Sequence, residues 1–315
     1  MANAMNILVT GATGYIGSQL VRRLLSLGHN VTAIVLKGTG TEALQPCISQ
    51  VRVCLYDGTQ SSLAPAFQHE KIDLAFHLAS LFLVRHKPED VDRLIASNVL
   101  FPSQLLEMME LAGVRKLVNA GTSWQHYQDA PYNPVNLYAA TKQAFESLLE
   151  YYVQAQGFTA VTLKFFDTYG PGDNRPKLFS LLRKTARSGE PLKMSPGQQE
   201  IDPVYIDDVL DALVSAAERA MGTEKSETYG VCSGKSMTLQ SLVGLYGEIV
   251  KRPLNIEWGG LPYRPREVMT PWKHAVLLPG WQARTPLREG IARMERDPSI
   301  GGLLAGTGMQ NEEQK

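Results

Sequence analysis

Short apolar runs and stretches with helical periodicity alternate regularly through the first half of the chain. Residues 6–10 (NILVT) are an apolar run typical of a buried strand, and residues 16–27 follow with apolar positions at helical spacing, ended by Gly28. Further strand-like runs and helical stretches occupy residues 31–35, 51–55, 74–78, 91–112, 117–120, 138–156 and 160–166. This alternation predicts an α/β fold, a doubly wound parallel sheet of the Rossmann type with helices on both faces.

The pattern changes near residue 167. Proline and glycine become frequent, the strand rhythm fades, and helices are predicted over residues 178–188 and 207–220. We therefore predict a dinucleotide-binding domain over residues 1–166 and a smaller, partly helical substrate region over residues 167–300, partly interleaved with the first. Residues 301–315 lack periodicity and are predicted to form a disordered tail.

The composition argues against several classes of protein. The chain has 315 residues, and its 31 Lys+Arg balance its 31 Asp+Glu, so neither a nucleic acid nor an anionic membrane is expected as a partner. No apolar run approaches the roughly 20 residues of a membrane span, and no signal peptide is visible. Cys47, Cys54 and Cys232 have neither paired nor metal-like spacing, which predicts no metal site and a reducing, cytoplasmic location.

A glycine-rich turn joins the first predicted strand to the first predicted helix. In TGATGYIG, residues 10–17, the glycines Gly11, Gly14 and Gly17 are spaced three apart. A tight turn with bare backbone, followed by the N–H groups of a helix, suits the pyrophosphate of a dinucleotide. An ordinary strand-to-helix turn is the alternative, but the position in a βαβ unit favours a cofactor site.

The end of the second predicted strand bears on the choice of dinucleotide. An NAD site usually places a carboxylate there, whereas this chain has Val35, Leu36 and then Lys37. A lysine suits the 2′-phosphate of NADP, so NADP(H) is favoured over NAD(H). The alternative is that Lys37 is an ordinary solvated surface lysine.

Tyr138 and Lys142 stand one helical turn apart in NLYAATKQAFE, with only small side chains between them. On a helix they share a face. A neighbouring ammonium stabilises a phenolate and lowers the pKa of a tyrosine toward neutrality, where proton transfer is efficient. By itself, the pair is also common on surface helices.

Together these motifs resemble the extended short-chain dehydrogenase/reductase family. The resemblance covers about residues 5–290 and includes HLAS (residues 77–80), DTYGPGD (167–173), VYIDDV (204–209) and PYRPREV (262–268). It implies an NAD(P) cofactor. The cofactor contacts that it implies are Gly11, Thr13, Gly14, Tyr15, Ile16, Gly17, Lys37, Asp57, Leu78, Ala79, Ser80, Asn98, Tyr138 and Lys142.

The resemblance also assigns catalytic roles. Tyr138 would exchange a proton with a substrate oxygen while hydride passes to or from the nicotinamide, and Lys142 would lower its pKa and bind the nicotinamide ribose. A third hydroxyl would bond the same substrate oxygen. Ungapped alignment of the preceding strand favours Thr122 for that role, with Ser123 as the fallback.

Two comparisons within the family indicate the type of reaction. The dehydratases carry an Asp-Glu pair after the threonine, where this chain has Ser123 and Trp124. The epimerases retain NAD and usually carry the strand-end acid that is missing here. What remains is an NADPH-dependent keto reduction, with an NAD-dependent C4 epimerase as the runner-up and a dinucleotide-binding regulator or scaffold as the non-enzymatic alternative.

The second half resembles enzymes that act on nucleoside-diphosphate sugars, for instance a CDP- or dTDP-4-keto-6-deoxyhexose. Arg264 would be the best diphosphate ligand, with Arg175 and Lys177 as further candidates. Asp167 and Ile201 depart from the family's Asn and Arg at positions that normally touch the diphosphate, so the substrate class is less firmly implied than the cofactor.

The family also implies a homodimer, formed through the helices over residues 91–112 and 138–156. The side chains expected to form an apolar seam between the subunits are Phe101, Leu105, Met108, Met109, Phe145 and Leu149. The alternative is that these side chains only face the sheet.

Overall fold

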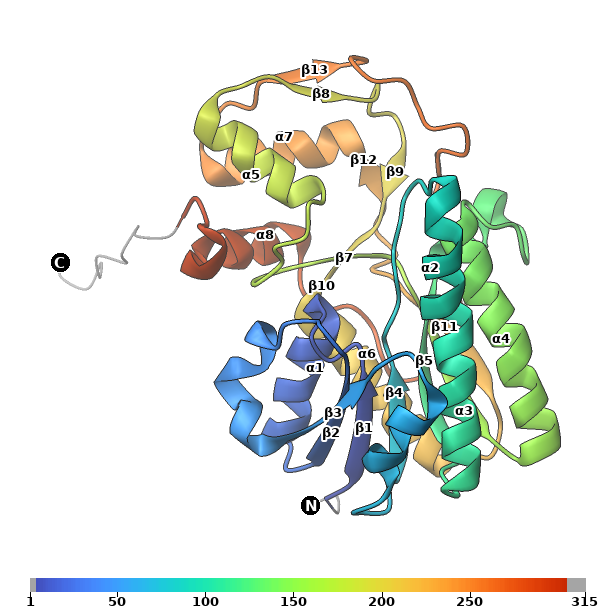
Figure 1. The fold of residues 1–315 in the computed structure, drawn as a ribbon. Helices are drawn as coiled ribbons and strands as arrows, with labels where there is room; N and C mark the ends of the chain where they lie inside the picture. Colours follow the sequence, from blue (N-terminus) through green and yellow to red (C-terminus); the bar gives the residue numbers. More distant parts are fainter. Residues whose placement is uncertain (1–3, 305–315) are drawn as a thin grey trace.

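A seven-stranded parallel sheet forms the centre of the computed structural model, which describes residues 4–304 (Figure 1). The strands are β1 (Asn6–Thr10), β2 (Asn30–Leu36), β3 (Val51–Tyr56), β4 (Leu74–His77), β5 (Lys116–Thr122), β6 (Thr159–Phe165) and β11 (Glu227–Val231), in the order β11-β6-β5-β4-β1-β2-β3. The chain runs outward from β1 to β3 and then returns to β4 on the other side of β1. This order confirms the predicted doubly wound fold, and its reversal between β1 and β4 is where such sheets bind ligands.

Helices cover both faces of the sheet. On one face lie α1 (Tyr15–Ser26) and α6 (Ile206–Gly222); on the other, α3 (Phe101–Leu111) and α4 (Leu137–Gln156) run side by side (Figure 1). Successive strand residues point to opposite faces. In β1, Ile7 and Val9 therefore pack in the core with α1 and α6, whereas Leu8 packs in the core with α3 and α4.

The helix predicted over residues 91–112 is interrupted. It consists of α2 (Val91–Ile95), a π-helical turn (Ala96–Leu100) and α3. Pro102 has no N–H to donate to the carbonyl of Asn98, so the regular bonding pattern cannot continue at this point. The wider turn places Asn98, which is 1% exposed, in the interior of the protein.

A smaller part of the molecule stands above the sheet. It contains α5 (Leu178–Ser188), α7 (Leu239–Val250) and α8 (Leu287–Arg296), drawn in the upper half of Figure 1. Short two-stranded ladders connect these helices: β7 (Asp167–Tyr169) with β10 (Pro203–Tyr205), β8 (Leu192–Met194) with β13 (Ile256–Trp258), and β9 (Glu200–Ile201) with β12 (Met237–Thr238).

The seventh strand, β11, was missed by the sequence analysis. Its sequence, ETYGV, is short and contains a glycine, so it lacks the strong apolar pattern of the other strands. It pairs with β6 at the edge of the sheet, and α6 packs beneath β5 and β6. The chain therefore returns to the sheet after entering the upper part. The division at residue 166 into a cofactor domain and a substrate region stays a prediction.

The predicted tail, residues 301–315, lies outside the described residues from 305 onward. Residues 302–304 are held near α8 by backbone hydrogen bonds, from Gly302 to Asp297 (3.0 Å) and from Leu304 to Glu295 (2.8 Å). None of the helices formed by residues 4–304 has the length and apolar character needed to cross a bilayer.

The side chains expected to form the subunit seam face the wrong way for it. Phe101, Leu105, Met109, Phe145 and Leu149 are all at most 6% exposed within the single chain, where they pack against the sheet, and Met108 is partly buried against the same core. The prediction that these residues form the subunit seam was therefore wrong. An amphipathic helix on a sheet turns its most apolar face toward that sheet, so this face is not available to a second subunit.

Candidate active site

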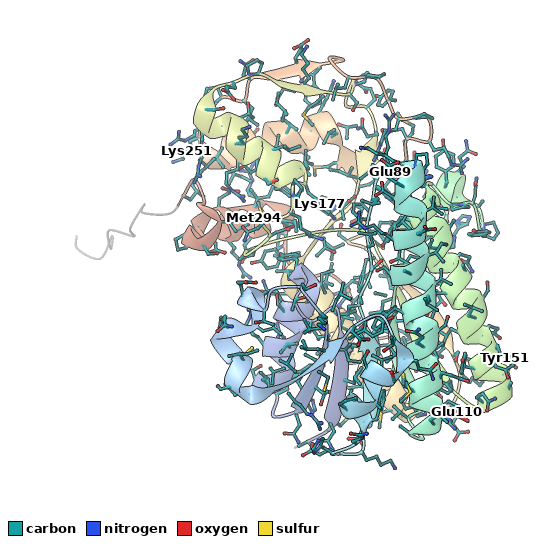
Figure 2. All side chains as sticks on the ribbon, viewed as in Figure 1. Glu89, Glu110, Tyr151, Lys177, Lys251 and Met294 are labelled. Carbon is teal, nitrogen blue, oxygen red and sulfur yellow. The ribbon has the colours of Figure 1, made fainter. Side chains whose placement is uncertain are left out.

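Two adjoining cavities lie at the carboxyl edge of the sheet. The smaller, of about 280 Å³, is lined by the glycine loop together with Tyr138 and Lys142. The larger, of about 640 Å³, extends toward α5 and β8, and it is within the size range of small-molecule sites. Residues common to both linings are Phe82, Ser123, Trp124, Phe166, Asp167, Thr168, Arg175 and Lys177. Figure 2 shows one of them, Lys177, between the sheet and the upper part of the molecule.

The glycine loop forms a cradle that other residues would fill. Gly11 has φ +69°, and a Cβ there would lie 2.6 Å from the backbone nitrogen of Ala79. A Cβ on Gly17 would collide with the carbonyl oxygen of Gly11. Gly14 caps α1 without a side-chain hydrogen bond, and the first turn of the helix carries no acidic residue. The free N–H groups of that turn therefore fit a pyrophosphate.

The other predicted cofactor residues fall into two groups. Tyr15, Ile16, Leu78 and Ser80 line the smaller cavity with the glycines. Outside that lining are Thr13, Ala79, Asn98, Lys37 and Asp57. Thr13 and Ala79 lie in the two segments that form the cradle, so only the last three are separated from it.

Lys37 and Asp57 follow paired strands. The Lys37 N–H donates to the carbonyl of Tyr56 (2.7 Å). This bond continues the pairing of β2 with β3, so Lys37 directly follows β2 and Asp57 directly follows β3. Asp57 accepts hydrogen bonds from the hydroxyl (2.6 Å) and N–H (3.0 Å) of Thr59. These bonds, with a smaller contribution from Lys37, lower the pKa of Asp57. A carboxylate therefore follows the third strand, although none follows the second.

Tyr138 lies in the first turn of α4. Asn136 caps the helix by accepting from the Ala139 N–H (3.0 Å), and its own amide donates to the carbonyls of Leu83 (3.1 Å) and Val84 (3.0 Å). The cap thus joins the start of α4 to the loop after β4. The edge of the Phe82 ring, from the same loop, packs against Tyr138 with ring centroids 4.9 Å apart.

The pKa of the Tyr138 phenol is set by burial and by two nearby hydroxyls. Burial raises the pKa of Tyr138 to about 12, although hydrogen bonds with Ser80 and Thr122 act to lower it. The sequence analysis expected Lys142 to bring this pKa down toward neutrality. Burial outweighs the polar contacts here, and the role of Lys142 in lowering the pKa of Tyr138 stays a prediction.

Lys142 shares the predicted helix face with Tyr138, and both line the smaller cavity. Its side chain is almost fully buried, with the residue 2% exposed. Burial lowers the pKa of Lys142 to about 8, and the nearby carboxylate of Glu146 partly offsets this effect. Lys142 is therefore an ammonium at neutral pH whose charge is easily lost.

The structure distinguishes Thr122 from Ser123. Thr122 ends β5, lines the smaller cavity with Tyr138, acts on the pKa of its phenol, and accepts from the Trp124 N–H through Oγ1 (3.3 Å). Ser123 lies next to it on both cavity walls. The geometry favours Thr122 as the hydroxyl that acts with Tyr138.

Asn98 forms its hydrogen bonds with neighbouring residues of the protein. Its side-chain oxygen accepts from the Leu81 N–H (2.8 Å) and the Ser80 hydroxyl (3.2 Å), and its amide donates to Leu81 O (3.0 Å) and Thr141 Oγ1 (2.9 Å). These four bonds tie the loop after β4 to α4. Asn98 thereby positions Ser80, whose hydroxyl acts on the pKa of Tyr138.

Two of the three cations predicted to bind a diphosphate, Arg175 and Arg264, are already paired with carboxylates. Arg175 donates to both oxygens of Asp173 (2.6 and 2.7 Å), and Arg264 forms a two-pronged ion pair with Glu267. Lys177 and Asp167 also line both cavities. Burial raises the pKa of Asp167, while Lys177, Arg264 and Arg175 act to lower it. The three cations thus face three carboxylates.

Aromatic side chains form a large part of the cavity wall, and the sequence analysis did not identify them as functional. Phe82 and Trp124 lie with ring centroids 5.5 Å apart, and Phe166 lies parallel to Trp272 at 6.4 Å. Arg264 lies 5.5 Å from the Trp124 ring and Lys177 5.2 Å from the Phe82 ring. Phe82, Trp124 and Phe166 each follow a strand end, which was a usable signal.

Comparison with known proteins identifies the family of the chain. The model of a family described as "NAD dependent epimerase/dehydratase family" matches residues 7–232. A CDP-abequose synthase of Yersinia pseudotuberculosis is 28% identical over 85% of this chain and 92% of its own. A UDP-glucose 4-epimerase of Mycolicibacterium smegmatis is 30% identical over 92% of this chain and 97% of its own.

Two solved structures of similar proteins have the same fold as this chain. MoeE5 in complex with UDP-glucuronic acid and NAD is 29% identical, with a TM-score of 0.77 over 92% of this chain and 97% of that one. A UDP-glucose 4-epimerase of Thermus thermophilus, in complex with NAD, is 25% identical, with a TM-score of 0.79 over 96% of this chain and 100% of that one.

Proposed function

The chain belongs to the NAD-dependent epimerase/dehydratase family, and from this premise we propose that it reduces a keto group of a nucleoside-diphosphate sugar with NADPH. The membership confirms the family resemblance predicted from the motifs, and it supports an NAD(P)-dependent enzyme. The observation that carries the proposal is that Tyr138, Lys142 and Thr122 line the smaller cavity together with the glycine loop, and that this cavity shares Ser123, Trp124 and Phe166 with the larger one. This placement lets one cavity hold a dinucleotide while the other holds the sugar nucleotide.

The protonation state of Tyr138 favours reduction. When bound, the cofactor supplies hydride to the carbonyl carbon. The carbonyl oxygen then needs a proton, and a phenol with a pKa of about 12 is fully protonated at neutral pH. Thr122 donates a hydrogen bond to the carbonyl oxygen, and Tyr138 transfers its proton to that oxygen. The Lys142 ammonium stabilises the phenolate left behind until solvent returns a proton.

The cofactor is proposed to be NADP(H). Gly11, Gly14 and Gly17 would face its pyrophosphate, with Tyr15, Ile16, Leu78 and Ser80 around it and Asp57 on the adenine side. Lys37, which is exposed and follows a strand that ends without an acid, would bind the 2′-phosphate. The solved relatives named above are in complex with NAD, so the preference for NADP rests on Lys37 alone.

The substrate is proposed to be a CDP- or dTDP-4-keto-6-deoxyhexose, reduced at C4. Arg264, Arg175 and Lys177 line the larger cavity and would face the diphosphate, with Asp167 beside them. One relative is named for a CDP-linked sugar and another for a UDP-linked one. A guanidinium fork suits phosphate, and the aromatic rings near Tyr138 suit the sugar.

An NAD-dependent C4 epimerase is the second candidate. The 30%-identical relative is a UDP-glucose 4-epimerase, which favours it. An epimerase first removes a proton from a hydroxyl and would need the phenolate of Tyr138, whereas a reductase starts from the phenol. A non-enzymatic dinucleotide-binding regulator is a third candidate, against which the grouping of Tyr138, Lys142 and Thr122 in one cavity argues. A homodimer and a cytoplasmic location stay proposals.

The test is to follow NADPH oxidation with CDP-, dTDP-, UDP- and GDP-linked 4-keto sugars. Rapid oxidation with one nucleotide series supports the ketoreductase. NAD that stays bound through purification, together with interconversion of C4 epimers, would establish the epimerase instead. A protein that binds dinucleotide and turns over none of these sugars would indicate the regulator.

A further inference from the structure

The end of the larger cavity nearest Tyr138 is walled by a fixed aromatic stack. Trp272, from the chain segment between β13 and α8, lies flat against the ring of His126, with centroids 3.8 Å apart and planes inclined by 12°. Phe166 lies parallel to Trp272, inclined by 14°. All three line the larger cavity, and Phe166 also lines the smaller one, next to Tyr138.

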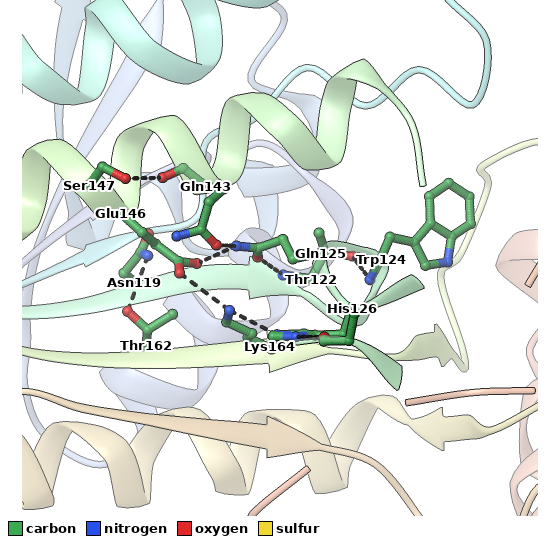
Figure 3. Close-up of polar contacts among 11 residues, drawn as sticks. Asn119, Thr122, Trp124, Gln125, His126, Gln143, Glu146, Ser147, Thr162 and Lys164 are labelled. Atoms are coloured by element: carbon green, nitrogen blue, oxygen red, sulfur yellow. Dashed lines mark hydrogen bonds and ion pairs between the residues drawn. The ribbon is translucent and has the colours of Figure 1, made fainter. Parts of the chain in front are cut away.

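His126 is held in one orientation. Its Nε2 accepts from the ammonium of Lys164 (3.0 Å), so its Nδ1 carries the proton and donates to the carbonyl of Ala130 (3.0 Å), as Figure 3 shows in part. Burial and the charge of Lys164 lower the pKa of His126, which keeps the ring neutral. With both nitrogens engaged, the ring supports Trp272 and does not exchange protons with a substrate.

A buried network connects this stack to the catalytic hydroxyl. Lys164 forms an ion pair with Glu146 (3.3 Å), and the two side chains are only 6% and 14% exposed. Glu146 accepts from the amide of Gln125 (3.0 Å), whose oxygen accepts from the Thr122 N–H (3.0 Å) (Figure 3). Removing one side chain from such a network leaves others buried and unpaired. The network therefore fixes the position of the aromatic stack relative to Thr122.

The wall around Trp272 is apolar in character. Lys164 lies behind His126 and is already paired with Glu146. Asp167 lies beside Phe166 in the chain and lines both cavities, where Lys177, Arg264 and Arg175 act on its pKa. Arg264 lies against the ring of Trp124 and Lys177 against that of Phe82, whereas among the described residues no cation lies against the ring of Trp272.

We propose that Trp272 is a specificity-determining residue that packs against the C5 methyl of a 6-deoxy sugar, and that His126 is the residue that positions it. Aromatic rings bury methyl and C–H groups favourably, whereas a hydroxymethyl loses hydrogen bonds to water there and a carboxylate loses still more, because it is charged. The site therefore takes a 6-deoxyhexose in preference to the corresponding hexose or hexuronic acid. This inference rests on the proposed function and deepens it by naming the residues that recognise C6.

The test measures binding without turnover. Calorimetry, with NADP⁺ present, compares 6-deoxyglucose, glucose and glucuronic acid on the same nucleotide, in a dTDP series and a CDP series. We expect the 6-deoxy sugar to bind on the order of 10–10² times more tightly than glucose, and glucuronic acid to bind least. Equal affinities, a preference for glucose or glucuronic acid, or no binding by any of the three would overturn the inference.

Two variants of one residue separate specificity from folding. Trp272→Ala should bring the ratio between 6-deoxyglucose and glucose close to one while leaving the affinity for the free nucleotide unchanged, and Trp272→Phe should restore most of the ratio. His126→Asn should lower the ratio as Trp272→Ala does. A ratio that survives in Trp272→Ala would contradict the proposal, and if that variant does not fold, the wild-type comparison still decides. Absence of NADPH oxidation alongside a clear 6-deoxy preference would sink only the proposed reaction.

Discussion

Arg264 is bound by Glu267, three residues further along the same turn. Its Nε donates to Oε2 at 2.9 Å and its Nη2 to Oε1, while the Arg264 carbonyl accepts from the Glu267 N–H (3.1 Å). Although burial would raise the pKa of Glu267, the bonds from Arg264 hold it below its usual value, so the carboxylate is ionised at neutral pH. A diphosphate that binds Arg264 must compete with this carboxylate.

Glu267→Gln should therefore tighten binding of nucleoside diphosphates, because the guanidinium gains a free site for phosphate. We expect a gain of about 5- to 10-fold in affinity, the size of roughly 1 kcal/mol for a partly exposed charge pair. Calorimetry with CDP, dTDP and UDP measures it, and Asp211→Asn, which frees Arg23 outside both cavities, is the matched control. Weaker binding by Glu267→Gln would show instead that Glu267 contacts the ligand itself.

Tyr138→Phe should lower turnover by about 10²–10⁴, the usual loss when positioned proton transfer is removed. NADPH binding and stability should change little, because only one hydroxyl is lost. Tyr151→Phe is the control, since Tyr151 is on the same helix but 58% exposed. Steady-state kinetics decide the matter, and a Tyr138→Phe enzyme with near wild-type turnover would end the proposed mechanism.

Lys142 should make both activity and stability depend on pH. The ammonium is present below about pH 8 and lost above it, so turnover should fall as the pH rises through that value. In the unfolded chain a lysine keeps its proton to about pH 10.4. Between these two values the unfolded state binds more protons than the folded state, so the free energy of unfolding should rise with pH in that window.

Lys142→Met should remove this effect. At about pH 7 the variant should be more stable by on the order of 3 kcal/mol, because no charge is buried, yet it should lose turnover. Urea unfolding of both proteins at about pH 7 and about pH 9.5 measures the difference, which should shrink at the higher value. A variant that is less stable than the wild type at both pH values would show that burial of the Lys142 ammonium does not destabilise the folded state.

Lys37→Ala should weaken NADPH binding and leave NADH binding unchanged, since only NADPH carries the 2′-phosphate. A loss on the order of 10-fold is expected for one charge-assisted phosphate contact. Lys71→Ala, at an exposed lysine before β4, is the control. Equal binding of both cofactors by the wild type would contradict the assignment of Lys37.

A dimer, if formed through α2, α3 and α4, must use their outer faces. The exposed apolar side chains there are Ile95 (43%), Leu100 (49%), Leu148 (41%) and Tyr151 (58%). Leu148→Glu should convert a dimer into monomers, because a charge cannot be buried unpaired at such an interface. Light scattering at micromolar concentration measures the mass, with Leu111→Glu at the helix end as control. A wild-type monomer would refute the dimer.

Local sequence determined the sheet and the cofactor cradle. The bounds of β1 and α5, the glycine turn and the shared face of Tyr138 and Lys142 all depend on periodicity or turn chemistry within a few residues, which a single chain displays directly. The same local signal failed at β11, whose short edge strand has little pattern, and at the π-helical turn, where Pro102 interrupts a helix that otherwise keeps its period.

Only the tertiary structure decided the electrostatics and the walls of the site. The raised pKa of Tyr138 comes from burial, and the hydroxyls that oppose it come from the loop after β4 (Ser80) and the end of β5 (Thr122). The stacking of Trp272 on His126 joins residues far apart in the chain. Periodicity tells which side of a helix or strand is buried, but not what is buried against it. The pKa of a group and the shape of a cavity depend on those neighbours, and packing brings them together from anywhere in the sequence.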